Sequence, residues 1–368
     1  MILVIPLTDC SRRNFYAPEF DAADFSSIEF SKKNLLYAEQ FTIEHSAQYS
    51  IVKINGEKPV LVVKEGAPLP AHVPAEFNVV KKPLEKTYLV SSSVMDFLIK
   101  LNAIDRIKFS GTKKENWFLP EAVQAMEDGK IIYAGKYSAP DYEILYSSGT
   151  DISIQNTMIY HKPEVKEKLE QLGIPVIVEK SSYEKNPLGK LEWIKLYGLL
   201  FDKEKEADDF FSLKMNEFST FEKLKNTEKK TAFFYITSNG AVNVRKPGDY
   251  IPKMIEMAGG KYFIDAAELE EDNAFSSMNM QAEDFYIKAK DADILIYNST
   301  IDGMITEKKI LLKKYPLLKD FSAFESGKIY CTDKKLFQET SGTVDFMQDL
   351  NKILNDEETD FHYLVKIK

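Results

Sequence analysis

The stretch NPLGKLEWIKLYGLLFDKEKEADDFFSLKMNEFSTFEKLKN, residues 186–226, lies just past the midpoint of the chain and predicts two helices placed end to end. Asn186 is a favourable N-cap, Pro187 suits the first helical position, and Asp202 is a second N-cap candidate. Apolar residues then recur at helical spacing: Ala207, Phe210, Phe211, Met215, Phe218, Phe221 and Leu224. A helix from Lys203 to Lys225 would be roughly 34 Å long. The pattern alone fits either a strut across the back of two domains or an ordinary core helix.

Short β-branched runs alternate with helical patterns on both sides of this stretch. Before it, strands are expected at residues 87–90, 106–109, 130–133, 151–154 and 175–178, and after it at residues 231–236, 292–297 and 328–331. Such alternation is typical of βαβ units in mostly parallel sheets, which bind ligands at the carboxyl ends of their strands. We therefore expect an α/β fold with two Rossmann-like lobes, residues 86–186 and 227–368, joined through residues 187–226. The crevice between the lobes is the expected ligand site.

The first 85 residues divide into two parts. Residues 35–85 are expected to form a β-hairpin extension, because apolar runs at 49–54 and 59–63 flank the turn signal Asn55-Gly56. Residues 1–34 are polar and aperiodic after an apolar run, Met1 to Leu7, that ends shortly before Cys10. This start resembles the end of a bacterial lipoprotein signal, although the basic segment of such a signal is missing. Either Cys10 is a lipidation site behind a truncated signal, or the resemblance is accidental.

Composition limits the function classes. The chain has 368 residues, enough for two domains, and a formal net charge of −9. Arginine, which dominates base and phosphate recognition, occurs only at positions 12, 13, 106 and 245, so nucleic-acid binding is not expected. No apolar run approaches the roughly 18 to 20 residues of a membrane-spanning helix.

A bare metal site is not expected, whereas two other classes, an enzyme and a scaffold protein, remain as alternatives. The four histidines, at positions 45, 72, 161 and 362, fall mostly outside the expected cleft loops, so a bare metal site is not expected. The chain contains no glycine-rich nucleotide loop, no Gly-x-Ser-x-Gly elbow and no His-Glu-x-x-His motif. Because catalytic groups also assemble from distant residues, an enzyme stays open as an alternative, as does a scaffold protein with the same two lobes.

Several motifs resemble one known family. The segments 187–198 (PLGKLEWIKLYG), 246–263 (KPGDYI to MAGGKYF) and 172–176 (LGIPV), with Ala139-Pro-Asp-Tyr-Glu143 ahead of Asp151-Ile-Ser-Ile154, resemble ABC-transporter substrate-binding proteins of the iron-siderophore and cobalamin type. The pieces occur in the family's order, and the resemblance runs from about Lys86 to Leu354. Residues before Lys86 are an elaboration outside it.

The resemblance implies a fold and a mode of action. The family has two α/β lobes joined by a single long helix, which limits closure to small motions. Its members capture a ligand in the cleft and deliver it to an ABC permease and ATPase in the membrane, so an extracytoplasmic monomer, anchored through Cys10 and without a cofactor, is expected. The residues that match the family's two permease-docking glutamates are Glu143 and Glu283.

The expected ligand is a small-molecule metal chelate. Cleft loops should follow the strands, at residues 91–93, 110–118, 135–140, 155–161, 237–250, 275–279, 298–302 and 333–341. Flat side chains there suit an iron chelate such as a siderophore or haem, while the scarcity of arginine keeps cobalamin as an alternative. The candidate ligand contacts are Trp117, Tyr137, Tyr160, Arg245, Tyr250 and Phe275, and Phe118 and Phe337 lie in the same loops. Each aromatic residue could equally belong to a lobe core.

Overall fold

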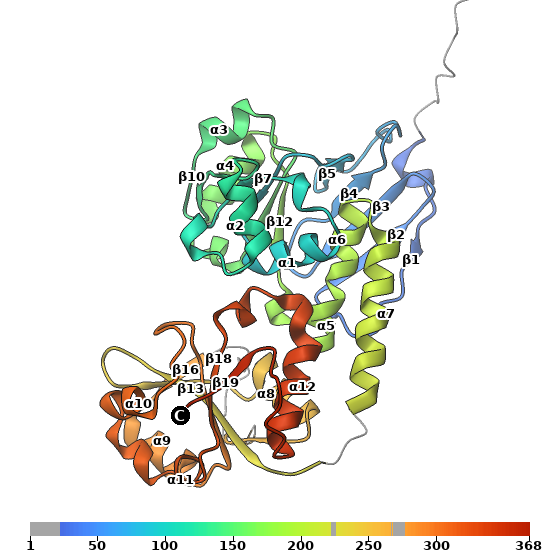
Figure 1. The fold of residues 1–368 in the computed structure, drawn as a ribbon. Coiled ribbons are helices and arrows are strands. Elements are labelled where there is room, and N and C mark those ends of the chain that lie inside the picture. The colour runs from blue at the N-terminus through green and yellow to red at the C-terminus, as the bar shows by residue number, and fades with distance from the viewer. Residues whose placement is uncertain (1–22, 222–225, 266, 268–276) are drawn as a thin grey trace, which may run out of the picture.

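The computed structural model describes residues 23–221, 226–265, 267 and 277–368. It shows two α/β lobes with a β-sheet extension beside the N-terminal lobe (Figure 1). The N-terminal lobe lies at the top of the view, the C-terminal lobe at the bottom, and helices α5 and α7 lie beside and between them. The expectation of a two-lobed α/β fold is confirmed.

The N-terminal lobe is built on a parallel sheet in the order β12-β11-β6-β7-β8. Its strands match the five predicted runs: β6 (Thr87–Leu89), β7 (Ile107–Ser110), β8 (Ile132–Tyr133), β11 (Ile152–Asn156) and β12 (Val176–Glu179). The connections carry α1 (Ser92–Lys100), α2 (Pro120–Glu127), α3 (Tyr142–Ser147), α4 (Pro163–Gln171) and a small hairpin of β9 (Gly135–Lys136) and β10 (Ala139–Pro140). The chain runs from β6 outward to β8 and then returns to β11. The sheet therefore reverses its progression between β6 and β11, where open α/β sheets bind ligands.

The C-terminal lobe has a mixed sheet in the order β16-β14-β13-β17-β18-β19, with β15 also paired to β13. The predicted strands are its parallel centre: β13 (Lys230–Ile236), β17 (Ile294–Tyr297) and β18 (Ile329–Thr332). Four strands were not predicted: β14 (Val242–Arg245), β15 (Lys261–Tyr262), β16 (Ser277–Met280) and β19 (Leu364–Lys366). Its helices are α8 (Tyr250–Met257), α9 (Ala282–Ala289), α10 (Lys308–Lys314), α11 (Ser322–Glu325) and α12 (Thr343–Leu354). The parallel centre of this sheet is therefore flanked by strands that pair antiparallel, β14 and β16 on one side and β19 on the other.

The N-terminal extension is a five-stranded sheet, not a single hairpin. Its order is β1 (Ser31–Lys32), β2 (Phe41–His45), β3 (Tyr49–Ile54), β4 (Val60–Val63) and β5 (Asn78–Lys81). The predicted hairpin is β3 and β4, but residues 55–59 form a five-residue loop instead of a two-residue turn. Gly56 has φ +74°, a backbone conformation that favours glycine.

The extension is attached through buried carboxylates, and we call this contact the extension seam. Glu192, which is fully buried, accepts the backbone N–H groups of Leu36, Tyr37 and Ala38 at 2.8–3.0 Å. Glu184 accepts the backbone N–H groups of the next two residues, 39 and 40, at 2.8 and 3.0 Å. Buried carboxylates are tolerated where several donors replace their lost hydration, so these bonds fix segment 36–40 to the linker.

Three helices link the lobes: α5 (Pro187–Glu192), α6 (Ile194–Leu200) and α7 (Glu204–Phe221). The end-to-end arrangement predicted for them is wrong, since α6 and α7 lie side by side (Figure 1). Asp202 does not act as an N-cap inside a straight rod; it has φ 57° and lies in the turn that reverses the chain. Gly198 allows the close approach, because a Cβ there would lie 2.6 Å from the Cβ of Ala207.

Helix α7 corresponds to the long helix of the sequence prediction. It packs against α6 on the side of the N-terminal lobe and against α12 of the C-terminal lobe. Phe211 and Phe218 are buried along it, Phe210 and Met215 are partly buried, and Lys214 Nζ lies 2.9 Å from Asp345 Oδ1 of α12. The helix therefore crosses from one lobe to the other, and its predicted end at Lys225 lies outside the described residues. None of the described helices is both long enough and apolar enough to span a bilayer.

Candidate functional site

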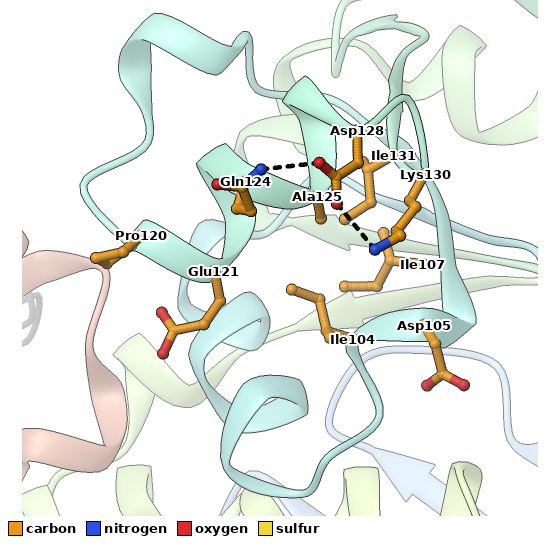
Figure 2. Close-up of a pocket in the computed structure, with 10 residues that line it drawn as sticks. All are labelled: Ile104, Asp105, Ile107, Pro120, Glu121, Gln124, Ala125, Asp128, Lys130 and Ile131. Atoms are coloured by element: carbon orange, nitrogen blue, oxygen red, sulfur yellow. Dashed lines mark hydrogen bonds and ion pairs between the residues drawn. The ribbon is translucent and has the colours of Figure 1, made fainter.

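One cavity lies on the surface of the N-terminal lobe, not between the lobes. It measures about 680 Å³ and is bordered by α2 and the start of β7 (Figure 2). Ile104, Ile107 and Ile131 give it an apolar floor, and charged side chains stand at its edge, among them Asp128, which bonds Lys130. The start of β7 is the amino end of the sheet. Because open α/β sheets bind ligands at the carboxyl ends of their strands, this cavity is not the favoured ligand site.

A second cavity, of about 330 Å³, lies between the lobes. We call it the inter-lobe cavity; its lining residues are Ser92, Phe118, Ser299, Thr300, Ile301, Gly303, Lys334, Phe337 and Gln338. Ser92 begins α1 directly after β6, and Ser299 and Lys334 follow β17 and β18. The cavity therefore lies at the carboxyl ends of strands from both sheets. The expected cleft loops 91–93, 110–118, 298–302 and 333–341 supply all of these residues except Gly303.

The inter-lobe cavity is mainly apolar and hydroxylic, with a positive charge. Among the described residues that line it, Lys334 is the only charged one, and its Nζ lies 5.6 Å from the ring centroid of Phe118 on the opposite lobe. Ser92, Ser299 and Thr300 contribute hydroxyl groups. Ser299 is held in place from behind, since its backbone N–H donates to Thr332 Oγ1 at 3.0 Å. A ligand with acceptor or anionic groups beside an apolar surface fits this lining.

One segment of the C-terminal lobe, residues 338–341, bonds the N-terminal lobe beside the cavity; we call this contact the lobe clasp. Gln338 accepts the backbone N–H of Phe118 and donates to the carbonyl of Asn116, each at 2.8 Å. The backbone N–H and hydroxyl of Ser341 donate to the carboxylate of Asp96 in α1, at 2.6 and 3.0 Å. Burial raises the pKa of Asp96 to about 6, against the lowering effect of the bonds from Ser341.

Exposed apolar side chains gather at the same strand ends. Phe118 in the N-terminal lobe and Ile301 in the C-terminal lobe line the cavity and are 42% and 63% exposed. Met158 and Tyr160 follow β11, Tyr183 follows β12, and Met304 follows β17, all of them exposed. Large exposed apolar side chains on both sides of a crevice are typical of a binding surface. Together with the inter-lobe cavity, they make the crevice the candidate functional site.

The sequence-predicted contacts in the N-terminal lobe lie around this site, not in its lining. Of the two possibilities for Trp117, ligand contact or lobe core, the structure shows the core: its side chain is only 4% exposed and belongs to the largest hydrophobic cluster. Its neighbour Phe118 reaches the cavity instead. Tyr137 lies between β9 and β10 and packs against the core of the N-terminal lobe. Tyr160 is exposed, and its hydroxyl donates to Glu57 of the extension.

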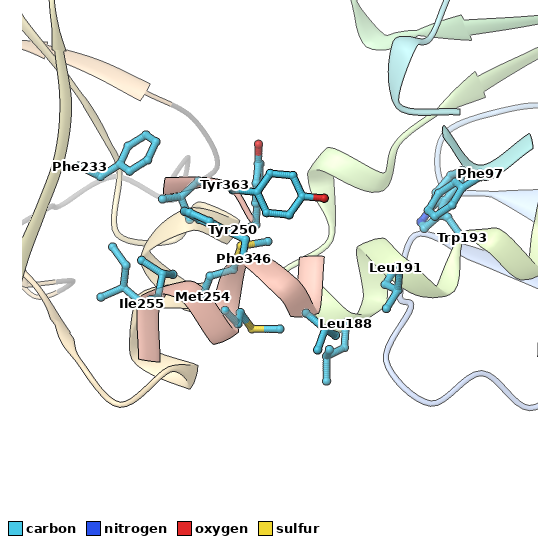
Figure 3. Close-up of a cluster of buried hydrophobic side chains, with 14 of the residues drawn as sticks. Phe97, Leu188, Leu191, Trp193, Phe233, Tyr250, Met254, Ile255, Phe346 and Tyr363 are labelled. Atoms are coloured by element: carbon cyan, nitrogen blue, oxygen red, sulfur yellow. The ribbon is translucent and has the colours of Figure 1, made fainter. Parts of the chain in front are cut away.

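Two predicted contacts in the C-terminal lobe lie directly behind the cavity. The guanidinium carbon of Arg245 is 5.5 Å from the ring centroid of Phe337 and 5.8 Å from that of Tyr250, and Arg245 also pairs with Asp249 at 3.3 Å. Burial raises the pKa of Asp249, and the charge of Arg245 opposes this shift. Figure 3 shows Tyr250 within the buried hydrophobic cluster, near Met254. Arg245 and Tyr250 therefore support Phe337, and Phe275 lies outside the described residues.

The two predicted docking glutamates occupy equivalent places on the two lobes. Glu143 lies in the first turn of α3 and Glu283 in the first turn of α9, and both are exposed. Their helices lie at opposite ends of the molecule, one on each lobe (Figure 1). An exposed carboxylate in the first turn of a helix is available to a partner's arginine. Cys10 lies outside the described residues.

Sequence reasoning missed the polar side chains that line the cavity. Ser299, Lys334 and Gln338 fall in loops that were predicted to face the cleft, but only aromatic residues and Arg245 were selected from those loops. The signal that could have identified these side chains is their position in loops that follow parallel strands. Among the described residues, no three histidine, cysteine or acidic side chains form a group that could hold a metal ion.

Comparison with known proteins places this geometry in context. The periplasmic binding protein family matches residues 89–336. An uncharacterized lipoprotein of Methanocaldococcus jannaschii is 26% identical over 294 residues, which cover 76% of this chain and 67% of the relative. Among solved structures, an ABC-type Fe3+-hydroxamate transport protein of Saccharomonospora viridis has a TM-score of 0.57 at 19% identity, covering 74% of this chain and 93% of that one. A periplasmic haem-binding protein of Pseudomonas aeruginosa has a TM-score of 0.60 at 14% identity, covering 77% and 98%.

Proposed function

Because the chain belongs to the periplasmic binding protein family, we propose that it captures an iron chelate in the inter-lobe cavity and delivers it to an ABC-type importer. The observation that carries this proposal is the cavity itself, which combines one lysine, three hydroxyl side chains and two phenylalanines at the strand ends of both lobes. Iron chelates such as ferric siderophores and haem carry acceptor or anionic groups on an apolar framework. No catalytic step is part of the proposal.

The volume of the cavity limits the size of the ligand that it can hold. At about 330 Å³ it is near the lower end of the ~300–1,000 Å³ that ligand pockets occupy. A modest chelate fits between the lobes as they stand, whereas a corrin ring with its side groups requires them to separate further. The porphyrin ring of haem is about as large as a corrin ring, so the volume favours a small ferric siderophore; haem stays within the proposal, and cobalamin remains the alternative of the same class.

Titration of the purified protein with a ferric siderophore, haem and cyanocobalamin tests the ligand. We expect saturable quenching of tryptophan fluorescence with an iron chelate, because Trp117 adjoins Phe118 in the cavity wall. Lys334→Glu reverses the only charge in the described lining and should weaken binding at least about tenfold, or ~1.4 kcal/mol. The matched control is Lys319→Glu, an exposed lysine of the same lobe outside the cavity. Absence of saturable binding to all three probes would refute the proposal.

Delivery requires a partner in the membrane, and we propose Glu143 and Glu283 as its contacts. Replacing both with alanine should leave chelate affinity unchanged and abolish uptake in cells that carry the importer, because an exposed carboxylate contributes to docking and not to the cavity. Glu121→Ala, which removes an exposed first-turn glutamate of α2, is the control. Normal uptake by the double variant would contradict the docking role.

The place of action is also part of the proposal. The family is periplasmic, and the M. jannaschii relative is a lipoprotein. We propose that this chain works outside the cytoplasmic membrane and is anchored by a lipid on Cys10. Metabolic labelling with a fatty acid, lost in Cys10→Ala, is the test.

A further inference from the structure

The N-terminal extension reaches the ligand crevice through one loop. Residues 55–59, which join β3 and β4, lie against the carboxyl ends of β11 and β12. Glu57 in this loop accepts the hydroxyl of Tyr160 at 2.5 Å, and Lys180, directly after β12, donates to the carbonyl of Asn55 at 2.5 Å. Gly56 has φ +74°, and a Cβ there would lie 3.4 Å from Lys180 Nζ. The loop conformation therefore brings Glu57 and Lys180 together beneath Tyr160.

The polar groups of this cluster are buried or paired, whereas the tyrosine ring is presented to solvent. The Glu57 side chain is 7% exposed, pairs with Lys166, and lies 3.8 Å from Lys180 Nζ. The Lys180 side chain is 10% exposed, and its Nζ lies 5.2 Å from the ring centroid of Tyr160. Tyr160 itself is 41% exposed. One end of the ring is held by a carboxylate and its face contacts a cation, so its orientation is fixed although the ring is uncovered.

The uncovered ring belongs to the crevice. Tyr160 follows β11, the neighbour of β6, whose own carboxyl end leads to Ser92 in the inter-lobe cavity. The ends of these two strands are in contact, because the backbone N–H of Ser91 donates to the carbonyl of Ile154 at 3.3 Å. Exposed Met158 lies on the same short helix as Tyr160, residues 157–161, and exposed Tyr183 follows β12. The three exposed side chains therefore follow β11 and β12 at the same edge of the sheet as the cavity.

We propose that Tyr160 is a stacking surface for the ligand and that Glu57 is its positioning residue, so that the extension shapes the binding site. This inference rests on the proposed function and narrows it to chelates with a flat conjugated face, such as a catecholate siderophore or haem. An aliphatic chelate presents no ring to Tyr160. The extension would then be a specificity element, and not only a covering of the linker.

The hydrogen bond between Glu57 and the Tyr160 hydroxyl, which we call the tether, is tested first without ligand. In protein labelled with ¹³C-tyrosine, the ring resonances of Tyr160 should shift in Glu57→Ala, because the hydroxyl loses its acceptor. Burial and the bond to Glu57 also raise the pKa of Tyr160, and this shift should decrease in the variant. The control is Glu44→Ala, which removes a similar lysine pair, Glu44 with Lys53 at 2.8 Å, from the same extension sheet. An unchanged Tyr160 spectrum in Glu57→Ala would overturn the positioning role.

The binding role is tested by a double-mutant cycle with ferric tris-catecholate, haem and an aliphatic ferric hydroxamate as probes. Tyr160→Ala should weaken binding of the probes with rings about tenfold, and Glu57→Ala about threefold, with little effect on the hydroxamate. In the Tyr160→Ala background, Glu57→Ala should have no further effect, whereas a purely structural role of Glu57 would weaken binding in both backgrounds.

The outcomes separate this inference from the proposed function. Binding of a chelate by the wild type that is unchanged in Tyr160→Ala, or additive effects in the cycle, would overturn the inference and leave the proposed function intact. Absence of binding to any probe by the wild type would overturn the proposed function and this inference with it, even where the tyrosine spectra confirm the tether.

Discussion

The extension seam and the lobe clasp are both built from buried carboxylates that accept backbone N–H groups, yet they differ in strength and in their response to pH. In the extension seam, Glu192 has four donors, three backbone N–H groups and Lys195 Nζ at 2.7 Å. In the lobe clasp, the described part of the chain gives Asp96 two donors, both of them on Ser341. A larger number of hydrogen-bond donors offsets more of the free energy that burial of a carboxylate costs. The comparison indicates that the extension is a fixed part of the N-terminal lobe, while the lobes are held together more weakly.

The pKa values of the two carboxylates shift in opposite directions. Burial alone would raise the pKa of Glu192, but the bonds from Lys195 and residues 36–38 outweigh it and hold this pKa below its ordinary value. Burial prevails at Asp96 and raises its pKa to about 6. A lowered pKa contributes stability that is lost as pH falls, whereas a raised carboxyl pKa contributes stability that is lost as pH rises. Acidification should therefore weaken the extension seam and strengthen the lobe clasp.

The largest effect is expected for Glu192→Ala. The change leaves three backbone N–H groups and the Lys195 ammonium buried without their acceptor, so it should lower the free energy of unfolding by about 3–5 kcal/mol. Urea unfolding at pH 7 measures this change. The control is Glu206→Ala, because Glu206 is exposed and its pair with Lys203 on α7 is screened by water, so its loss should lower the free energy of unfolding far less. A similar small cost for Glu192→Ala would remove the basis for calling the extension fixed.

A smaller, pH-dependent effect is expected at Asp96. Between its ordinary pKa of 3.8 and a pH of about 6, the folded wild type binds more protons at Asp96 than the unfolded chain, so the stability from this group falls as pH rises. The difference across that window is roughly 3 kcal/mol. Two nearby charges also act on this carboxylate: Lys100 lowers the pKa of Asp96, and Glu339 raises it.

Asp96→Asn removes this titration while an amide can still bond Ser341. The slope of stability against pH between pH 4 and 6 should therefore become more positive in the variant than in the wild type. Urea unfolding at several pH values provides the measurement, with the exposed Asp320→Asn as control. Parallel curves for the wild type and Asp96→Asn would show that Asp96 is not a buried, weakly compensated group.

The positions of the parallel strands along the chain were the feature most readily predicted from sequence. The strands of the N-terminal lobe other than β8 are short, largely buried runs rich in apolar residues, and such runs are conspicuous. By contrast, β16 is a short edge strand and β14 lies between it and β13; they contain Asn279 and Asn243, and their sequences show no such run. The hairpin of α6 and α7 depends on the φ of one residue, Asp202, which a pattern of apolar spacing does not report.

The candidate site was predicted by position better than by residue. The expected loops reach the inter-lobe cavity because the carboxyl ends of strands follow from the sheet topology. Which side chain of a loop enters the cavity depends on local backbone direction, and so Trp117 turns inward while Phe118 turns to the crevice. The role of Glu57 depends on contact between segments about a hundred residues apart, and a single sequence carries no pattern for it.

The smallest effect on stability is expected for Gln338→Ala. This variant also tests most directly whether the lobe clasp is weak. The side chain is at the edge of the cavity and its two bonds are partly accessible to water, so the loss should be about 1 kcal/mol or less. The backbone N–H of Phe118 loses its acceptor in this variant, and its hydrogen exchange should become faster while exchange in segment 36–40 is unchanged. Gln124→Ala, which removes a bond within the exposed surface of α2, is the control. If the Phe118 amide stays protected in Gln338→Ala, the lobes are held by contacts other than the lobe clasp, and the contrast with the extension seam does not hold.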